Sequence, residues 1–184
     1  GTFPAGFTFK PFVAYAALME GIVGEHTTFV SSGGISVGPW FFPDWKLGGH
    51  GLTDVRKAIA WSVNTFFYII GGGLDQVTGL GVERITSYAR QFGFGEKTGI
   101  DLQEEIFSQN EELKKGYEIN FATASFGQGI AITPIQLVRA FSAIANGGKM
   151  VKPYLVENLA PKENSENFII SRKTSSQLVT MMVS

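Results

Sequence analysis

The chain contains no cysteine, and this absence excludes disulfide bonds and metal sites built on thiolates. Long apolar runs are also missing, because no stretch reaches the roughly 18 residues that a membrane-spanning helix needs. Basic clusters are absent as well, and the formal net charge over the 184 residues is −1. A protein that binds nucleic acid usually carries a basic patch, so we expect no nucleic-acid partner.

The residues that are present indicate a globular protein with a sizeable core. Hydrophobic residues make up 44% of the chain, charged residues make up 17%, and there are 16 phenylalanines. We find neither an internal repeat nor a linker, and we therefore expect residues 1–184 to form one domain. The chain opens without a signal-peptide pattern and closes inside an apolar pattern, which favours a part of a longer protein.

Apolar residues at helical spacing predict several helices. The predicted helices cover residues 8–23, a segment that starts near Thr53 as its N-cap, and residues 65–70, 81–92, 134–146 and 171–183. The sixth helix has Ser171 as its cap. The helix at 134 has the clearest start, since Thr133 caps it, Pro134 takes the first position and Gln136 completes a capping box.

The remaining segments show little periodicity. We expect residues 24–51 to form a long ordered loop, with short strands possible only at 27–30 and 35–37. Residues 150–159 read as a strand, and residues 161–167 read as a polar loop. The prediction is therefore a mixed α+β protein in which helices predominate.

Residues 4–12 carry the most informative motif, which reads Pro-Ala-Gly-Phe-Thr-Phe-Lys-Pro-Phe. This segment resembles the Pro-x-Gly-Ser-x-x-Lys-Pro-Phe stretch of penicillin-binding proteins. In that family a serine sits at a helix N-terminus and a lysine follows one turn later on the same face. A neutral lysine can take the proton of the serine, and the helix dipole stabilises the negative charge that develops on its oxygen.

Three further blocks extend this resemblance over most of residues 3–160. Residues 44–51 and residues 59–68 are similar to the region of the second motif in class B, elongation-type members. The motif itself is Ser62-Val63-Asn64, within residues 59–68. Residues 92–102 are similar to a connecting loop of the family, and residues 127–148 are similar to its Gly-Gln-Gly segment and the helix after it. The blocks occur in the family's order. The resemblance implies the transpeptidase fold that these proteins share with serine β-lactamases, mostly its helical part.

The chain departs from the family at two places. The position of the nucleophilic serine holds Phe7, which has no atom that can be acylated, and Thr8 points about 100° away around the helix. The third motif, Lys-Thr-Gly on an inner strand, is also missing. Residues 97–99 spell it, but they lie in the connecting loop and are expected to form a turn. The resemblance implies that the third-motif strand would follow the last helix.

The resemblance also implies the roles of individual residues. Lys10 would act as the base, Ser62 would relay a proton, and Asn64 would bond the substrate amide. Gln128, between Gly127 and Gly129, would shape the substrate cleft or contact the substrate. Some relatives bind zinc near Asp44 and His50 with an added cysteine, but Val63 stands at that position here. Two ligands are too few for a closed zinc site, so we expect hydrogen bonding there and neither a metal nor a cofactor.

The expected function is that of a peptidoglycan D,D-transpeptidase domain in cell-wall synthesis, inactive as written because of Phe7. The alternative is a non-catalytic pseudoenzyme or scaffold module of the elongation machinery. A serine β-lactamase is a weaker rival, because no deacylating carboxylate can be placed. The implied partners are peptidoglycan stem peptides, a cell-wall elongation glycosyltransferase and, once the serine is restored, β-lactams. The implied location is the outer face of the cytoplasmic membrane, with the anchor outside this chain.

Overall fold

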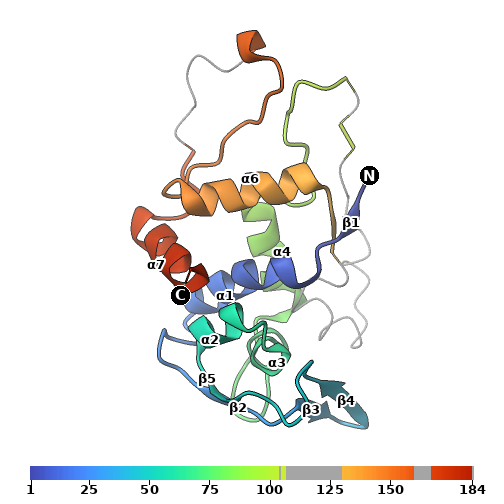
Figure 1. Ribbon diagram of the computed structural model, residues 1–184, viewed down its shortest axis with the longest axis vertical. Coiled ribbons are helices and arrows are strands. Elements are labelled where there is room, and N and C mark those ends of the chain that lie inside the picture. The colour runs from blue at the N-terminus through green and yellow to red at the C-terminus, as the bar shows by residue number, and fades with distance from the viewer. Residues whose placement is uncertain (104, 107–129, 160–166, 184) are drawn as a thin grey trace.

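The computed structural model describes residues 1–103, 105–106, 130–159 and 167–183 (Figure 1). Helices dominate this part of the chain. They are α1 (Lys10–Met19), α2 (Val55–Ala60), α3 (Asn64–Gly72), α4 (Gly81–Gln91), α6 (Pro134–Ala145) and α7 (Arg172–Met182), with short 3-10 helices η1 (Gly6–Phe9) and η3 (Glu157–Leu159). The mixture of helices with a few strands agrees with the predicted α+β class.

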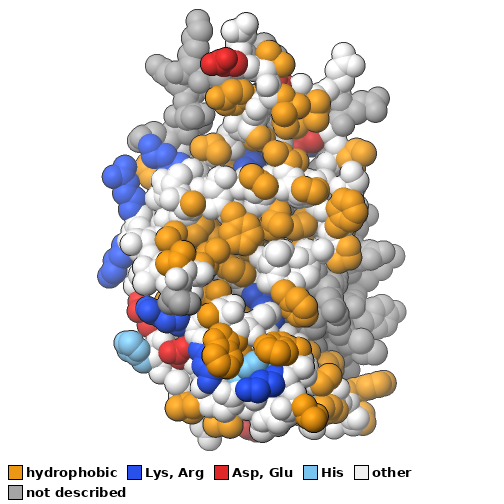
Figure 2. All heavy atoms as spheres, viewed as in Figure 1, with side chains coloured by type: hydrophobic (Ala, Val, Ile, Leu, Met, Phe, Trp, Pro, Cys, Tyr) orange, Lys and Arg blue, Asp and Glu red, His pale blue; other side chains and the backbone are white. Residues whose placement is uncertain are grey.

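The strands of the described residues form three small antiparallel pairs. They are β1 (Phe3–Pro4) with β6 (Ala131–Ile132), β2 (Phe29–Ser31) with β5 (Gly51–Thr53), and β3 (Gly34–Val37) with β4 (Trp40–Pro43). Pairs β2–β5 and β3–β4 lie at one end of the molecule, below α2 and α3 in Figure 1. The hairpin β3–β4 leaves Val37, Trp40 and Phe41 exposed, and hydrophobic side chains are visible at this end in Figure 2.

Helix α1 is the centre of the core. It packs against α2, α3, α4 and α7, and every residue from Lys10 to Ala17 is buried (Figure 1). Phe12 on this helix contacts the rings of Phe92, Phe94 and Phe141 at centroid distances of 4.8, 5.0 and 5.1 Å. A helix that is buried on all sides holds its first residue, Lys10, in a fixed place.

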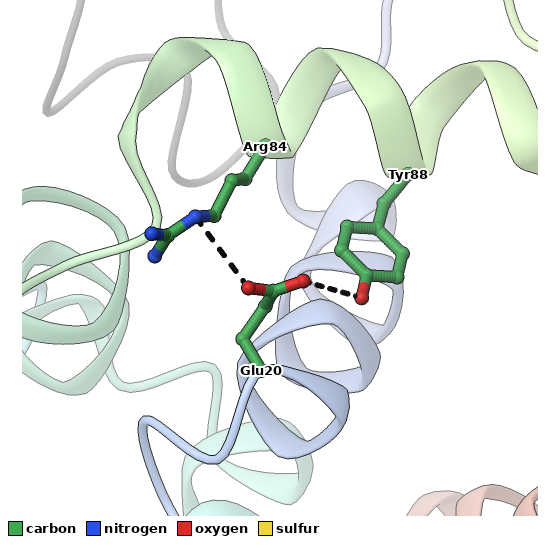
Figure 3. Close-up of polar contacts among 3 residues, drawn as sticks. All are labelled: Glu20, Arg84 and Tyr88. Atoms are coloured by element: carbon green, nitrogen blue, oxygen red, sulfur yellow. Dashed lines mark hydrogen bonds and ion pairs between the residues drawn. The ribbon is translucent and has the colours of Figure 1, made fainter.

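The end of α1 is tied to α4 by a group of polar side chains at the surface (Figure 3). The carboxylate of Glu20 accepts a hydrogen bond from the hydroxyl of Tyr88 at 2.8 Å and lies 3.5 Å from Nε of Arg84. Burial and the neighbouring carboxylate raise the pKa of Tyr88 to about 12. Because Arg84 and Glu20 are both partly exposed, this ion pair contributes little to stability.

Several predicted helix boundaries are confirmed. Thr133 and Gln136 form the capping box that begins α6, with Pro134 in the first position, and the hydroxyl of Ser171 accepts from the N–H of Thr174 to begin α7. The first helix is shorter than predicted, since η1 precedes α1 and the helix ends at Met19. Thr53 is not the cap of α2; Asp54 is, because its carboxylate accepts from the N–H of Lys57 at 2.8 Å.

Predictions for two extended segments were wrong in part or in full. In residues 24–51, the possible short strands at 27–30 and 35–37 correspond to β2 and β3, whereas β4 and the first residue of β5 lie in what was predicted as loop. The strand predicted at 150–159 does not form. There the carbonyl of Val151 accepts from Arg139, and the N–H groups of Leu155 and Val156 donate to the carboxylate of Asp101. Side chains thus satisfy backbone groups that a strand would have paired with another strand.

Candidate active site

Lys10 reaches the site because η1 turns directly into α1. Gly6 adopts a φ of +55°, a conformation that glycine takes without strain, and the hydroxyl of Thr8 donates to the carbonyl of Ala5 at 2.5 Å. Pro11 sits in the first turn of α1, where the missing N–H costs nothing. The side chain of Lys10 is only 2% exposed and points into the core side of the helix start.

The Lys10 amine contacts three oxygens from a segment more than 50 residues away. Nζ lies 2.9 Å from Oγ of Ser62, 2.8 Å from the carbonyl oxygen of Ser62 and 2.7 Å from Oδ1 of Asn64. The structure thus brings together the three side chains that the sequence singled out. Each distance is that of a direct hydrogen bond, and the hydroxyl of Ser62 is within reach for proton transfer with the amine.

Ser62 holds both of its oxygens toward Lys10 because of an unusual backbone conformation. It lies between α2 and α3 with a φ of +53°, in the left-handed region that residues with a Cβ adopt at a cost of about 1–2 kcal/mol. The N–H of Val63 donates to the carbonyl of Ala58, which fixes the turn from behind. Strained residues of this kind cluster at functional sites, and here the turn sets the distance between Ser62 and Lys10.

Opposing effects act on the protonation of Lys10. The neighbouring oxygens and the negative charge of Asp44 favour the ammonium form, whereas burial favours the neutral amine. Burial has the larger effect and lowers the pKa of Lys10 to about 7. A lysine with this pKa is partly neutral at neutral pH, and the neutral fraction can accept a proton.

Phe7 occupies the position one turn before Lys10 and presents a ring to it. The Nζ atom of Lys10 lies 4.7 Å from the centroid of the Phe7 ring and 5.0 Å from that of the Phe67 ring. The Phe7 side chain is 52% exposed, so the ring separates the amine from solvent on that side. Thr8 supplies no substitute oxygen, because its hydroxyl is bonded to Ala5.

The comparisons with known proteins agree with this geometry. The family model described as the penicillin binding protein transpeptidase domain matches residues 1–184. The chain belongs to the penicillin-binding protein transpeptidase family. It is 37% identical to the peptidoglycan D,D-transpeptidase MrdA of Salmonella typhimurium over 174 residues, which cover 86% of this chain and 26% of that protein. It is 36% identical to the stage V sporulation protein D of Bacillus subtilis over 188 residues, which cover 96% of this chain and 28% of that protein.

Solved structures lead to the same family. Penicillin-binding protein PBP2 of Helicobacter pylori, in a complex with MreC, superimposes with a TM-score of 0.82 at 27% identity, covering 98% of this chain and 34% of that one. A peptidoglycan synthase complex that coordinates polymerization and crosslinking gives a TM-score of 0.80 at 28% identity, covering 100% and 33%. The chain therefore spans about a quarter of its curated relatives and about a third of these structures. Among the residues described, no helix is long and apolar enough to cross a membrane.

The family resemblance also singled out residues 97–99 and 127–129, and the structure describes only the first of these segments. Gly127, Gln128 and Gly129 lie outside the described residues. Residues 97–99 are not on a strand: the carboxylate of Glu105 accepts from the N–H groups of Thr98 and Gly99 at 2.5 and 2.8 Å. They form an irregular segment held by a side chain, so the prediction that they do not form the third-motif strand is confirmed.

Asp44 and His50 are the two residues that the sequence offered as candidate metal ligands. Val63 is fully buried in the apolar core at the position of the additional cysteine. Within the described ranges, no group of three or more His, Asp or Glu side chains could hold a metal ion. Both oxygens of Asp44 already accept hydrogen bonds from protein groups, and the His50 ring lies edge-on to Trp45 and Trp61. Both ring nitrogens of His50 are buried without a hydrogen-bond partner, but one imidazole and one carboxylate that already accepts hydrogen bonds are too few ligands for a closed zinc site.

Two hydroxyl residues of this site could not be recognised from the sequence. Ser31 and Thr65 both donate to Asp44, although they lie 13 and 21 residues away from it along the chain. Neither residue belongs to a motif. Only the fold, which brings β2 beside the N-terminus of α3, reveals their role.

The lowered pKa of Lys10 predicts how stability depends on pH. In the unfolded chain this lysine has a pKa of 10.5, so between pH 7 and 10.5 the unfolded state binds more protons than the folded state. The free energy of unfolding should therefore rise with pH over this window, as the cost of a buried charge disappears. We expect the melting temperature of the original protein to rise between pH 7 and 9 relative to that of a Lys10→Met variant.

The comparison stops at pH 9 because tyrosines act in the opposite direction above pH 10. Burial raises the pKa of Tyr68 to about 12, so its unfolded form releases a proton first and stability falls. Equal pH slopes for the original protein and Lys10→Met would show that Lys10 keeps an ordinary pKa in the folded state.

Proposed function

We propose that this chain forms the helical part of a peptidoglycan D,D-transpeptidase site that is inactive as written. The observation that carries the proposal is the contact of the Lys10 amine with Oγ of Ser62 and Oδ1 of Asn64, at 2.9 and 2.7 Å. Three side chains from the two retained motifs meet at one buried amine whose pKa is about 7. A base of this kind suits the activation of a neighbouring hydroxyl nucleophile.

Each residue of the group has a proposed role. Lys10 in its neutral form takes the proton from the nucleophile, and Ser62 passes it on toward the leaving amine. Asn64 bonds Lys10 through Oδ1 and presents its amide group to the stem-peptide backbone. Gln128, between Gly127 and Gly129, contributes to the substrate cleft. In the complete reaction, a serine at position 7 attacks the carbonyl of the penultimate D-alanine, the terminal D-alanine leaves, and the amine of a second stem peptide takes the acyl group.

Phe7 blocks this reaction at its first step. Acylation requires an oxygen or sulfur nucleophile beside Lys10, and the phenyl ring offers neither. The same ring covers the amine at 4.7 Å, so water is also kept from the position of the attacking oxygen. We infer that the chain does not form an acyl-enzyme.

A second candidate is a non-catalytic module that retains the groove to bind stem peptides or a partner. The contact between Phe7 and Lys10 favours it, because the ring fills the nucleophile position while the polar network behind it is intact. The proposed partners are the other proteins of cell-wall elongation, including a glycosyltransferase. The related Helicobacter pylori protein was solved with MreC, and another relative in a peptidoglycan synthase complex. The proposed location is the outer face of the cytoplasmic membrane.

Binding of a pentapeptide that ends in D-Ala-D-Ala tests whether the chain recognises stem peptides. We expect saturable binding in a calorimetric titration and no added mass in intact-protein mass spectrometry. The same peptide ending in L-Ala-L-Ala is the matched control and should bind more weakly. Equal binding of both peptides, or of neither, would favour a module that recognises a partner protein and not stem peptides.

A further inference from the structure

Asp44 is a buried carboxylate that joins three separate segments of the chain. It lies directly after β4 and is 8% exposed. Its Oδ2 atom accepts from the hydroxyl of Ser31 on β2 at 2.7 Å and from the hydroxyl of Thr65 on α3. Its Oδ1 atom accepts from the backbone N–H of Asn64 at 2.6 Å and from that of Thr65 at 3.3 Å. Both oxygens of the carboxylate are thus engaged at the N-terminus of α3.

This arrangement stabilises the start of a helix that has no side-chain cap of its own. The residue before α3, Val63, cannot accept a hydrogen bond through its side chain. Asp44 supplies the acceptor from a different part of the chain, and its negative charge lies at the positive end of the helix dipole. Asp44 therefore caps α3 from a distant part of the same chain, and it fixes where α3 begins.

The first residue of α3 is also the residue that contacts Lys10. The backbone N–H of Asn64 donates to Asp44, and Oδ1 of Asn64 accepts from Nζ of Lys10 at 2.7 Å. The side-chain amide of Asn64 donates to the carbonyl of Pro43, the residue before Asp44, at 3.4 Å. Asn64 is held by the Pro43–Asp44 segment on one side and by Lys10 on the other.

We propose that Asp44 is a positioning residue of the transpeptidase site. Through Ser31, Thr65 and the N-terminus of α3 it holds Asn64 in place, and Asn64 in turn holds the Lys10 amine in place, without a metal ion. The proposal deepens the proposed function and rests on it for the meaning of the site. Hydroxyl donors from Ser31 and Thr65 occupy the carboxylate oxygens that a bound cation would need. The charge of Asp44 also raises the pKa of Lys10 against the effect of burial.

The other charged groups around this segment have partners of their own. Lys57 donates through Nζ to the carbonyls of His50 and Leu52, and Lys46 lies over the ring of Trp61. Burial lowers the pKa of His50. The charge of Asp44 raises this pKa, whereas the charges of Lys46, Lys57 and Lys10 lower it further.

The first test is an NMR titration of Lys10 in protein labelled at lysine Cε, with Phe7 left in place. We expect Asp44→Asn to lower the titration midpoint of Lys10 by about 0.5 or more, as the loss of one charge several ångströms away requires. We expect it also to shift the side-chain amide resonances of Asn64. Thr65→Val and Ser31→Ala keep the charge of Asp44 and each remove one hydroxyl hydrogen bond to it. The Asn64 resonances should therefore shift, while the Lys10 midpoint stays above that of Asp44→Asn. Thr28→Val and Ser32→Ala, at exposed positions nearby, are the matched controls and should change neither readout.

The second test measures the rate of penicillin labelling in a Phe7→Ser background that also carries the family's Lys-Thr-Gly strand. Thr65→Val and Ser31→Ala should slow labelling about tenfold or more, whereas the two exposed controls should stay within about twofold. Addition of zinc or of a chelator should leave the melting temperature and the Lys10 midpoint unchanged. A zinc-dependent rise in the melting temperature, or a zinc-dependent fall in the Lys10 midpoint, would overturn the metal-free assignment.

The outcomes separate this proposal from the proposed function. If Asp44→Asn, Thr65→Val and Ser31→Ala lower the melting temperature but leave the Lys10 midpoint and the Asn64 resonances unchanged, Asp44 is structural only and the positioning role is wrong. If Asp44→Asn does not fold, the two hydroxyl variants decide through the Asn64 resonances alone. If Phe7→Ser takes no label in any variant even with the Lys-Thr-Gly strand present, the proposed transpeptidase function fails, while the NMR readouts still decide the role of Asp44.

Discussion

A fluorescent penicillin should leave no covalent label on this chain, and Phe7→Ser should introduce labelling in a protein that also carries the family's Lys-Thr-Gly strand. A β-lactam acylates a hydroxyl that a base has activated, and Lys10 lies where that base is needed, 2.9 Å from Oγ of Ser62. At this cluster the base is present and the nucleophile is lacking. In serine enzymes the loss of the nucleophile costs on the order of 10⁶ in rate, so the expected difference is between no signal and a clear one.

Two controls make this experiment specific. Phe7→Ala removes the ring from the face of Lys10 without supplying an oxygen, and it should remain unlabelled. Phe7→Ser combined with Lys10→Met supplies the oxygen without the base, and it should label about 10²–10⁴ times more slowly than Phe7→Ser alone. Phe7→Ser within these 184 residues alone should label poorly, because the loss of even one oxyanion-hole donor costs about 10²–10³ in rate.

Two outcomes would contradict the proposal. Stoichiometric labelling of the unmodified chain would show that a nucleophile other than residue 7 serves the site. Failure of the repaired protein, with the third-motif strand present, would favour a pseudoenzyme whose groove has adapted to another use. The Lys10 titration separates these cases, because an intact base with a pKa near 7 that still fails to promote acylation points to changes elsewhere in the groove.

The sequence predicted those features that depend on local chemistry or on a motif. The capping box of α6 followed from Thr133, Pro134 and Gln136, whose side chains act within one turn. The meeting of Lys10 with Ser62 and Asn64 followed from the family resemblance and not from spacing, because nothing in 52 intervening residues encodes their proximity. The geometry of the site is thus a property of the fold that the motifs identify.

The features that the sequence missed depend on partners distant along the chain. Strands β4 and β5 carry Gly, Pro and aromatic residues without alternation, and each pairs with only one other strand, so no periodic burial pattern marks them. Asp44 looked like one of two candidate metal ligands, and the hydroxyls that satisfy it lie on other elements. Hydrogen bonds between elements leave no periodic trace in the sequence, whereas packing faces do.

Phe12→Ala should be among the most destabilising single substitutions in this chain, because it removes the ring at the centre of the aromatic core. Phe12 is 1% exposed, and its ring lies 4.8 Å from that of Phe92 and 5.0 Å from that of Phe94. Replacing a fully buried phenylalanine with alanine costs about 3–5 kcal/mol, through lost burial and the cavity left behind. The free energy of unfolding, from urea denaturation followed by near-UV circular dichroism, measures this loss.

Phe41→Ala is the matched control, since the same atoms are removed from a side chain that is 62% exposed on β4. Its effect should stay within about 0.5 kcal/mol.

Phe12 lies two residues after Lys10 on α1, so a cavity at this place should also loosen the helix start that positions the amine. The Lys10 titration midpoint of Phe12→Ala should then move from about 7 toward the ordinary value for lysine, as water gains access. Similar losses of stability for Phe12→Ala and Phe41→Ala would contradict a core centred on α1, and an unchanged midpoint would show that the site is held by the segment around Asn64 and not by the packing of α1.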